Sequence, residues 1–186
     1  MTPRFVALAV VVLVSACQGA AGARPSPTPS PRPVPATARP PVDAILADAQ
    51  VGLPRTGGLD HIGVLEAAHT QLNQAAALDL YRSWGWVDQA TRVWALGSQD
   101  SEEWLLLTVR QDGARRAFTF YSDQRAAATA QAGPCGAAAT ALDECAEWQS
   151  ESGTTILGRR GPFVFQLTAR GADADRLALL QAQKLT

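Results

Sequence analysis

The sequence predicts an α+β domain in residues 42–186, in which two ββα units form a four-stranded antiparallel sheet with helices packed on one face. Two pairs of β-rich runs predict hairpins at residues 91–111 and 154–170, because each pair is separated by a cluster of turn-forming residues. Helix-forming segments precede the first hairpin and follow the second. An internal repeat adds that each hairpin is followed by a helix.

The segment before the first hairpin predicts two helices and a loop. Residues 66–83 are rich in helix-forming residues and contain neither Gly nor Pro, so the longer helix is expected there. Gly85 then supplies a left-handed stop, and we expect the tryptophans on either side of it to pack back on the helix. A shorter helix is expected at residues 42–50, and residues 51–58 are predicted to form a loop.

The repeat decides between two interpretations of the segment after the first hairpin. The Asp-Gly dipeptide that ends at Gly113 is typical of a hairpin turn, whereas the apolar residues after it have helical spacing. Residues 107–118 resemble residues 167–178, and this second copy continues into an acid-started helix. We therefore expect helices at residues 113–131 and 173–184.

Residues 1–16 have the anatomy of a secretory signal peptide. A single basic residue, Arg4, precedes about 12 almost wholly apolar residues, and a helix that spans a bilayer needs about 20. Small residues end the run immediately before Cys17. A plain secretory signal cut near Ala20 is the alternative.

The order Val14, Ser15, Ala16, Cys17 resembles the lipobox of bacterial prolipoproteins. The resemblance implies that the Cys17 thiol carries a diacylglyceryl group and that Cys17 becomes the first residue of the mature protein. It also implies that the protein is attached to the extracytoplasmic face of the cell membrane by this lipid, since two acyl chains suffice for a stable anchor.

Residues 17–41 are predicted to form a lipidated cysteine followed by a proline-rich linker. Eight prolines lie between residues 24 and 41, where they exclude a packed helix or strand. A polyproline spacer of this length reaches about 55 Å. The linker therefore places the folded domain away from the membrane.

The composition of residues 42–186 excludes some classes of partner. These residues carry 12 Arg and Lys against 17 Asp and Glu, a formal net charge of −5. Nucleic acids and anionic lipid surfaces both favour a basic face, so neither is expected as a partner.

Cys135 and Cys145 are expected to form a disulfide, because paired cysteines in an exported chain are most simply bonded to each other. Closing a loop of about 11 residues contributes about 3 kcal/mol to stability in the chain-entropy model. A redox-active pair would favour a CxxC spacing, and a zinc site would favour shorter cysteine spacings with nearby histidines.

No catalytic or cofactor-binding motif is found, so we expect neither enzymatic activity nor a cofactor. His61 and His69 are too far apart on one helix to share a metal ion. The acidic pairs, Glu102 with Glu103 and Asp143 with Glu144, are expected to be solvated. Residues 52–59 have the GxxxxG spacing of a phosphate loop but lack its Lys and Ser or Thr.

Aromatic residues are the remaining candidates for a binding site, either as core residues or as the lining of a pocket for a small apolar ligand. A sheet edge near residues 158–165 is a possible site for a peptide strand, and the pair Arg159 and Arg160 in it is expected to lie in a solvated turn. The aromatic candidates are Trp84, Trp86, Trp94, Trp104, Trp148, Phe118, Phe120, Tyr121, Phe163 and Phe165.

Small α+β lipoprotein domains of GC-rich Gram-positive bacteria are similar in this order of elements, and many of them have no assigned activity. The sequence therefore predicts a lipid-anchored extracytoplasmic domain without catalytic activity that presents a surface to an envelope partner. A carrier for a small apolar ligand is the alternative.

Overall fold

The sheet has six strands, so the prediction of four was wrong. The structure is a computed structural model that describes residues 39–128, 132–151, 153–170 and 173–186, all within one compact unit. Neighbouring strands are antiparallel, in the spatial order β1-β2-β3-β6-β5-β4. The strands are β1 (Arg55–Gly57), β2 (Trp86–Leu96), β3 (Gln99–Thr108), β4 (Glu144–Ser150), β5 (Gly153–Arg160) and β6 (Phe163–Arg170).

The two additional strands are the edge strands of the sheet. Strand β1 has three residues and lies in a segment predicted to be a loop. Strand β4 lies in the segment that joins the two ββα units, and buries only Ala146 and Trp148. Strand β1 is very short and β4 contains few large apolar residues, so neither shows the alternation by which a strand is recognised in a sequence.

The four predicted strands are present and form the centre of the sheet. Strands β2 and β3 form the first hairpin, and β5 and β6 form the second. The two hairpins join through β3 and β6, where Leu105 is opposite Phe165.

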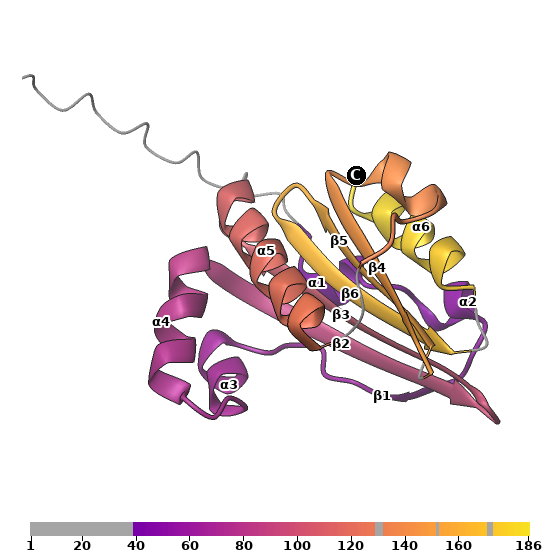
Figure 1. Cartoon of the computed structure of the whole chain (residues 1–186). Coiled ribbons are helices and arrows are strands. Elements are labelled where there is room, and N and C mark those ends of the chain that lie inside the picture. The colour runs from indigo at the N-terminus through magenta and orange to yellow at the C-terminus, as the bar shows by residue number, and fades with distance from the viewer. Residues whose placement is uncertain (1–38, 129–131, 152, 171–172) are drawn as a thin grey trace, which may run out of the picture. The chain divides into compact units, whose positions relative to one another are not determined.

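Helices cover both faces of the sheet, which corrects the prediction of a single covered face (Figure 1). Successive side chains of a strand point to opposite faces. Leu105 and Leu107 belong to one core cluster, and Leu106 between them belongs to the other. The helices are α1 (Pro41–Ala44), α2 (Asp48–Val51), α3 (Val64–His69), α4 (Gln74–Trp84), α5 (Gln111–Ala128) and α6 (Ala174–Lys184), with a 3₁₀ turn η1 (Ala137–Ala141).

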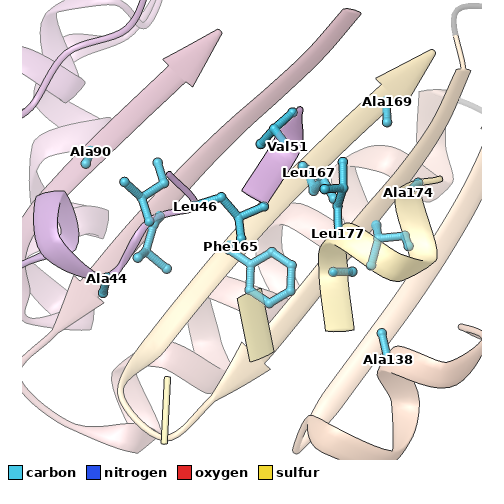
Figure 2. Close-up of a cluster of buried hydrophobic side chains, with 14 of the residues drawn as sticks. Ala44, Leu46, Val51, Ala90, Ala138, Phe165, Leu167, Ala169, Ala174 and Leu177 are labelled. Atoms are coloured by element: carbon cyan, nitrogen blue, oxygen red, sulfur yellow. The ribbon is translucent and has the colours of Figure 1, made fainter. Parts of the chain in front are cut away.

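The first face packs against α1, α2, α6 and η1. Its core includes Leu46 from the segment between α1 and α2, Val51 from α2, Phe165 from β6 and Leu177 from α6 (Figure 2). The second face packs against α3, α4 and α5. None of the helices among the described residues is long and apolar enough to cross a membrane.

The helix predicted at residues 66–83 is divided into α3 and α4. The side chain of Asn73 accepts a hydrogen bond from the backbone N–H of Ala76 at 3.1 Å, so Asn73 starts a new helix. Leu72, immediately before it, is fully exposed. The division therefore places an apolar side chain at a surface turn.

The helix predicted at residues 42–50 is likewise divided, into α1 and α2. The predictions for the later helices were accurate. Helix α5 begins two residues before the expected start, and α6 begins one residue after it. The last three residues of the range expected for α5, 129–131, lie outside the described residues.

Cys135 and Cys145 form the predicted disulfide, with their Cα atoms 6.1 Å apart. The bond attaches the segment that carries η1 to the edge strand β4. Asp175 of α6 accepts hydrogen bonds from the backbone N–H groups of Ala137 and Ala138 at 2.8 and 3.2 Å. The disulfide and these hydrogen bonds together hold η1 between β4 and α6.

Candidate functional site

An open apolar groove lies beside α4, where the turn between α3 and α4 approaches α5. Its volume is about 280 Å³, and apolar atoms make up most of its wall. The residues in its lining that carry polar side-chain groups are Gln71, Asn73 and Tyr81. The groove is lined by Gln71, Leu72, Asn73, Ala76, Ala77, Leu80, Tyr81 and Phe120.

Three local features fix α4 against α5. Gly85 ends α4 in the left-handed conformation, with φ of 69°. Gly113 lets the first turn of α5 approach the end of α4 closely, since a Cβ atom at Gly113 would lie 1.8 Å from the carbonyl oxygen of Trp84. A guanidinium nitrogen of Arg116 donates a hydrogen bond to the carbonyl of Ser83 at 2.5 Å.

A cluster of aromatic rings supports the floor of the groove. The ring of Trp84 lies 5.2 Å from that of Phe120 and 5.7 Å from that of Tyr121, measured between centroids. Tyr81 lies 5.1 Å from Trp84, and Trp104 of β3 lies 4.8 Å from Tyr121. Rings in this range of distances interact favourably beyond their burial, so the wall formed by Tyr81 and Phe120 is preorganised.

The hydroxyls of Tyr81 and Tyr121 hydrogen-bond to each other below the groove. Burial raises the pKa of both phenols above the ordinary value for tyrosine. Both therefore remain protonated near neutral pH, where a nucleophile or general base would have to lose its proton. The arrangement suits the binding of an apolar group.

The sequence-predicted aromatic residues are divided between the two faces. Of these residues, Phe120 lines the groove, and the core cluster of the second face contains it together with Trp84, Trp86, Trp104, Phe118, Tyr121 and Trp148. Trp94, Phe163 and Phe165 lie in the core of the opposite face. Tyr81 and Leu72 were not among the candidates. Their roles depend on the division of the predicted helix at Asn73.

Two of the polar predictions were wrong. Glu103 is fully buried on the first face of the sheet, whereas it was expected to be solvated. Arg159 is also buried, and forms ion pairs with Asp143 at 2.9 Å and with Glu144. The expectation of a solvated pair in the turn before Gly161 therefore fails for Arg159.

The expected open edge near residues 158–165 is also wrong. Strand β5 pairs with β4 and β6, and β6 pairs with β5 and β3, so both strands of this hairpin lie inside the sheet. A peptide strand cannot be added there.

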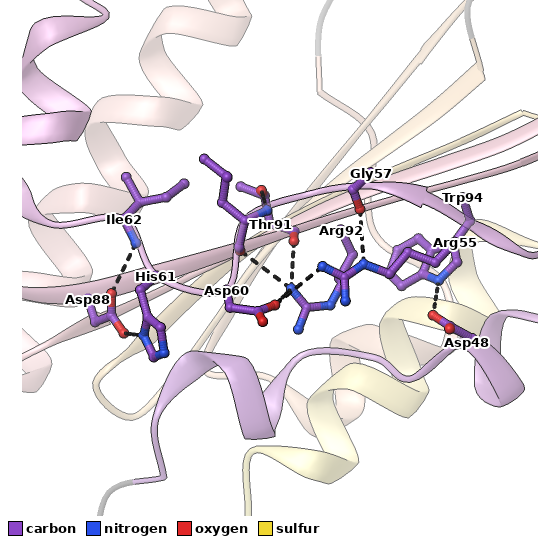
Figure 3. A network of polar contacts seen from close by, with 11 residues as sticks. Asp48, Arg55, Gly57, Asp60, His61, Ile62, Asp88, Thr91, Arg92 and Trp94 are labelled. Carbon is purple, nitrogen blue, oxygen red and sulfur yellow. Dashed lines mark hydrogen bonds and ion pairs between the residues drawn. The ribbon is translucent and has the colours of Figure 1, made fainter.

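The two histidines and Cys17 complete the list of sequence candidates. His61 Nδ1 lies 2.9 Å from an oxygen of Asp88 (Figure 3), and this hydrogen bond raises the pKa of His61. His69 lies in the last turn of α3. Within the described ranges, no group of three or more His, Cys, Asp and Glu residues is placed to hold a metal ion. Cys17 and the signal peptide lie outside the described residues.

Comparison with known proteins supports the fold. No protein-family model matches the chain, and no curated protein matches it in sequence. The structure is similar to the crystal structure of the extracellular domain of PknH from Mycobacterium tuberculosis, with a TM-score of 0.51 and 10% sequence identity. The match covers 84% of this chain and 96% of that chain. At this identity, the similarity shows a shared fold alone.

Proposed function

We propose that the chain is a lipid-anchored extracytoplasmic binding domain, without catalytic activity, that uses the groove beside α4 to hold an apolar segment of an envelope protein. Two observations support the location. The N-terminal order Val14, Ser15, Ala16, Cys17 resembles a lipobox, and the fold is shared with a domain described as extracellular.

The exposure of Leu72 is the observation that carries the binding function. Leu72 has no cover and lies on the rim of an apolar groove. Leu65 of α3, with 56% of its surface accessible, is a second exposed apolar side chain in the same helical pair. Exposed apolar groups next to a groove mark interaction sites when they are grouped.

A small apolar molecule is the second candidate for the occupant. Tyr81 and Phe120 give the groove an aromatic wall, and its volume of about 280 Å³ is near the lower limit for small-molecule sites. Such sites enclose most of their ligand, whereas this groove is open along its length. The open shape favours a protein segment.

The anchor can be tested at Cys17. Replacing Cys17 by serine removes the thiol to which the lipid would be attached, so the variant should leave the membrane fraction or accumulate as an uncleaved precursor. Fractionation and mass spectrometry of the N-terminus measure both results. A serine variant that is still processed and still partitions into detergent micelles would show that the protein is not anchored through Cys17.

The groove can be tested with two exposed leucines, of which only Leu72 lines it. A carboxylate at position 72 would have to be desolvated when the groove is filled, so Leu72→Asp should reduce the capture of an envelope partner at least about tenfold. Leu96→Asp is the matched control, because Leu96 is 60% exposed at the end of β2, outside the groove lining. The full chain in detergent serves as bait, and captured proteins are quantified by mass spectrometry.

The proposed surface is supported if Leu72→Asp reduces the capture of the partner and Leu96→Asp leaves it unchanged. Equal capture by both variants would contradict it. The carrier alternative predicts instead that an apolar fluorescent probe binds the wild type and the Leu96 variant more tightly than the Leu72 variant.

A further inference from the structure

Residues 41–53, which we term the strap, follow the proline-rich linker directly and are built into the core of the first face. Ala44, Ile45, Leu46, Val51 and Leu53 are all buried. Figure 2 shows Ala44, Leu46 and Val51 directed at the sheet beside Phe165 and Leu177. The linker therefore continues into a segment whose side chains are part of the core.

Helix α6 binds the strap through three polar side chains. Gln181 donates to the carbonyl of Ala44 at 3.1 Å, and Lys184 donates to the carbonyl of Ile45 at 2.5 Å. Lys184 also donates to the side chain of Gln50 at 3.3 Å, and Arg176 donates to its carbonyl at the same distance.

The sheet binds the strap through two further side chains. The carboxylate of Asp48 accepts a hydrogen bond from the indole N–H of Trp94 at 2.8 Å (Figure 3). The backbone N–H of Leu46 donates to Oε2 of Glu103 at 3.3 Å. Glu103 is thus the one carboxyl group of β3 that holds the strap, and it does so from a fully buried position.

The surroundings of Glu103 favour the neutral acid. Its other oxygen, Oε1, is buried without a hydrogen-bond partner, as are Oγ of Ser101 and Oε1 of Gln181. Burial raises the pKa of Glu103 to about 8, against the opposing effects of the Leu46 N–H, Lys184 and Arg92. A neutral carboxyl avoids the cost of burying a charge on an oxygen that has no hydrogen-bond donor.

The charged groups around this carboxyl are already occupied. Arg92, opposite Glu103 on β2, lies 2.8 Å from a carboxylate oxygen of Asp60 and donates to the carbonyl of Thr91. Lys184 donates a hydrogen bond to the strap, and the negative charge of Asp43 in α1 opposes the lowering of the Lys184 pKa by burial. An ionised Glu103 would therefore remain buried without an ion pair, which is a large energetic cost.

We propose that the strap is a latch that couples the linker to the core and opens when Glu103 loses its proton. Opening admits water to the carboxylate and releases the Leu46 N–H. It uncovers the apolar residues of the first face on which the strap lies, including Ala90, Leu105 and Phe165. Opening therefore lengthens the tether between the linker and the sheet, and changes which apolar surface the domain presents.

Hydrogen exchange of the full chain in detergent, followed by mass spectrometry, tests the latch. After correction for the intrinsic pH dependence of exchange, the protection of residues 44–51 should fall about tenfold for each pH unit between 6 and 8, because opening releases one proton. Amides of α5, on the opposite face, that exchange through local opening should show no such fall. In Glu103→Gln, which cannot ionise, the strap should show no such fall.

A second measurement uses the wild type alone, so that the proposal stays testable if the variant does not fold. The carboxyl carbon of Glu103, observed by NMR, should titrate near pH 8, at the upper end of the range in which strap protection falls. Strap protection independent of pH, an equal fall in Glu103→Gln, or titration of Glu103 at an ordinary glutamate pKa would each overturn the latch.

Discussion

Replacing Gly113 by alanine should destabilise the domain by about 3 kcal/mol, the upper part of the range for overpacked sites. The sign of this change is opposite to what helix propensity predicts, because alanine is normally favoured over glycine in a helix by about 1 kcal/mol. Gly113 lies in the first turn of α5, where an added Cβ would overlap the carbonyl oxygen of Trp84 at 1.8 Å. A backbone atom cannot move aside as a flexible side chain can.

Gly57→Ala is the matched control, since a Cβ at Gly57 would make only an ordinary contact of 3.7 Å with Val93. Its stability should lie within about 0.5 kcal/mol of the wild type. Chemical denaturation measures both changes, and near-ultraviolet circular dichroism reports the packing of Trp84. A Gly113→Ala variant that is as stable as the wild type would show that α4 and α5 do not meet as described.

The stability of the domain should also depend on pH through Glu103. Its pKa is about 8 in the folded protein and near 4.5 in the unfolded chain, so between these values only the folded state holds the proton. The free energy of unfolding should therefore fall as pH rises, by about 1.4 kcal/mol per pH unit, until the folded-state pKa is reached. This direction is the reverse of that for a carboxylate stabilised by an ion pair.

Glu103→Gln isolates this effect from other titrations. The raised pKa of His61 makes stability fall with rising pH as well, and it does so equally in both proteins. Urea denaturation between pH 5 and 8 should therefore show the variant gaining stability relative to the wild type at each step. Parallel curves for the two proteins would mean that Glu103 is ionised in the folded state.

The central hairpins and their following helices were predictable because each carries its own local signal. Runs rich in β-forming residues mark β3 and β6, and the acidic start of α6 is visible in the sequence. The pair of cysteines and the expected export of the chain were enough to predict the disulfide. These features depend on neighbours within a few residues.

Of the features that were missed, the burial of Glu103 depends on a distant contact, whereas the second helical layer and the start of α4 left a signal in the sequence. The second helical layer follows from β3 and β6 being buried on both faces, which makes their runs nearly continuous in apolar residues. Glu103 appeared solvated beside Glu102, and only the packing of the strap on β3 buries it. Asn73 is a typical residue for the start of a helix. Treating it as one would have predicted two helices, α3 and α4, with Leu72 in the exposed turn between them.

Site-specific photocrosslinking in the native envelope tests the central claim, that the groove beside α4 is the binding surface, most directly. A photoreactive residue is introduced into the full chain at position 72, or at position 96 as the control. We expect the photoreactive residue at position 72 to give a discrete crosslinked product with one envelope protein, and the residue at position 96 to give no such product. Identical products at both positions, or no product at position 72, would contradict it.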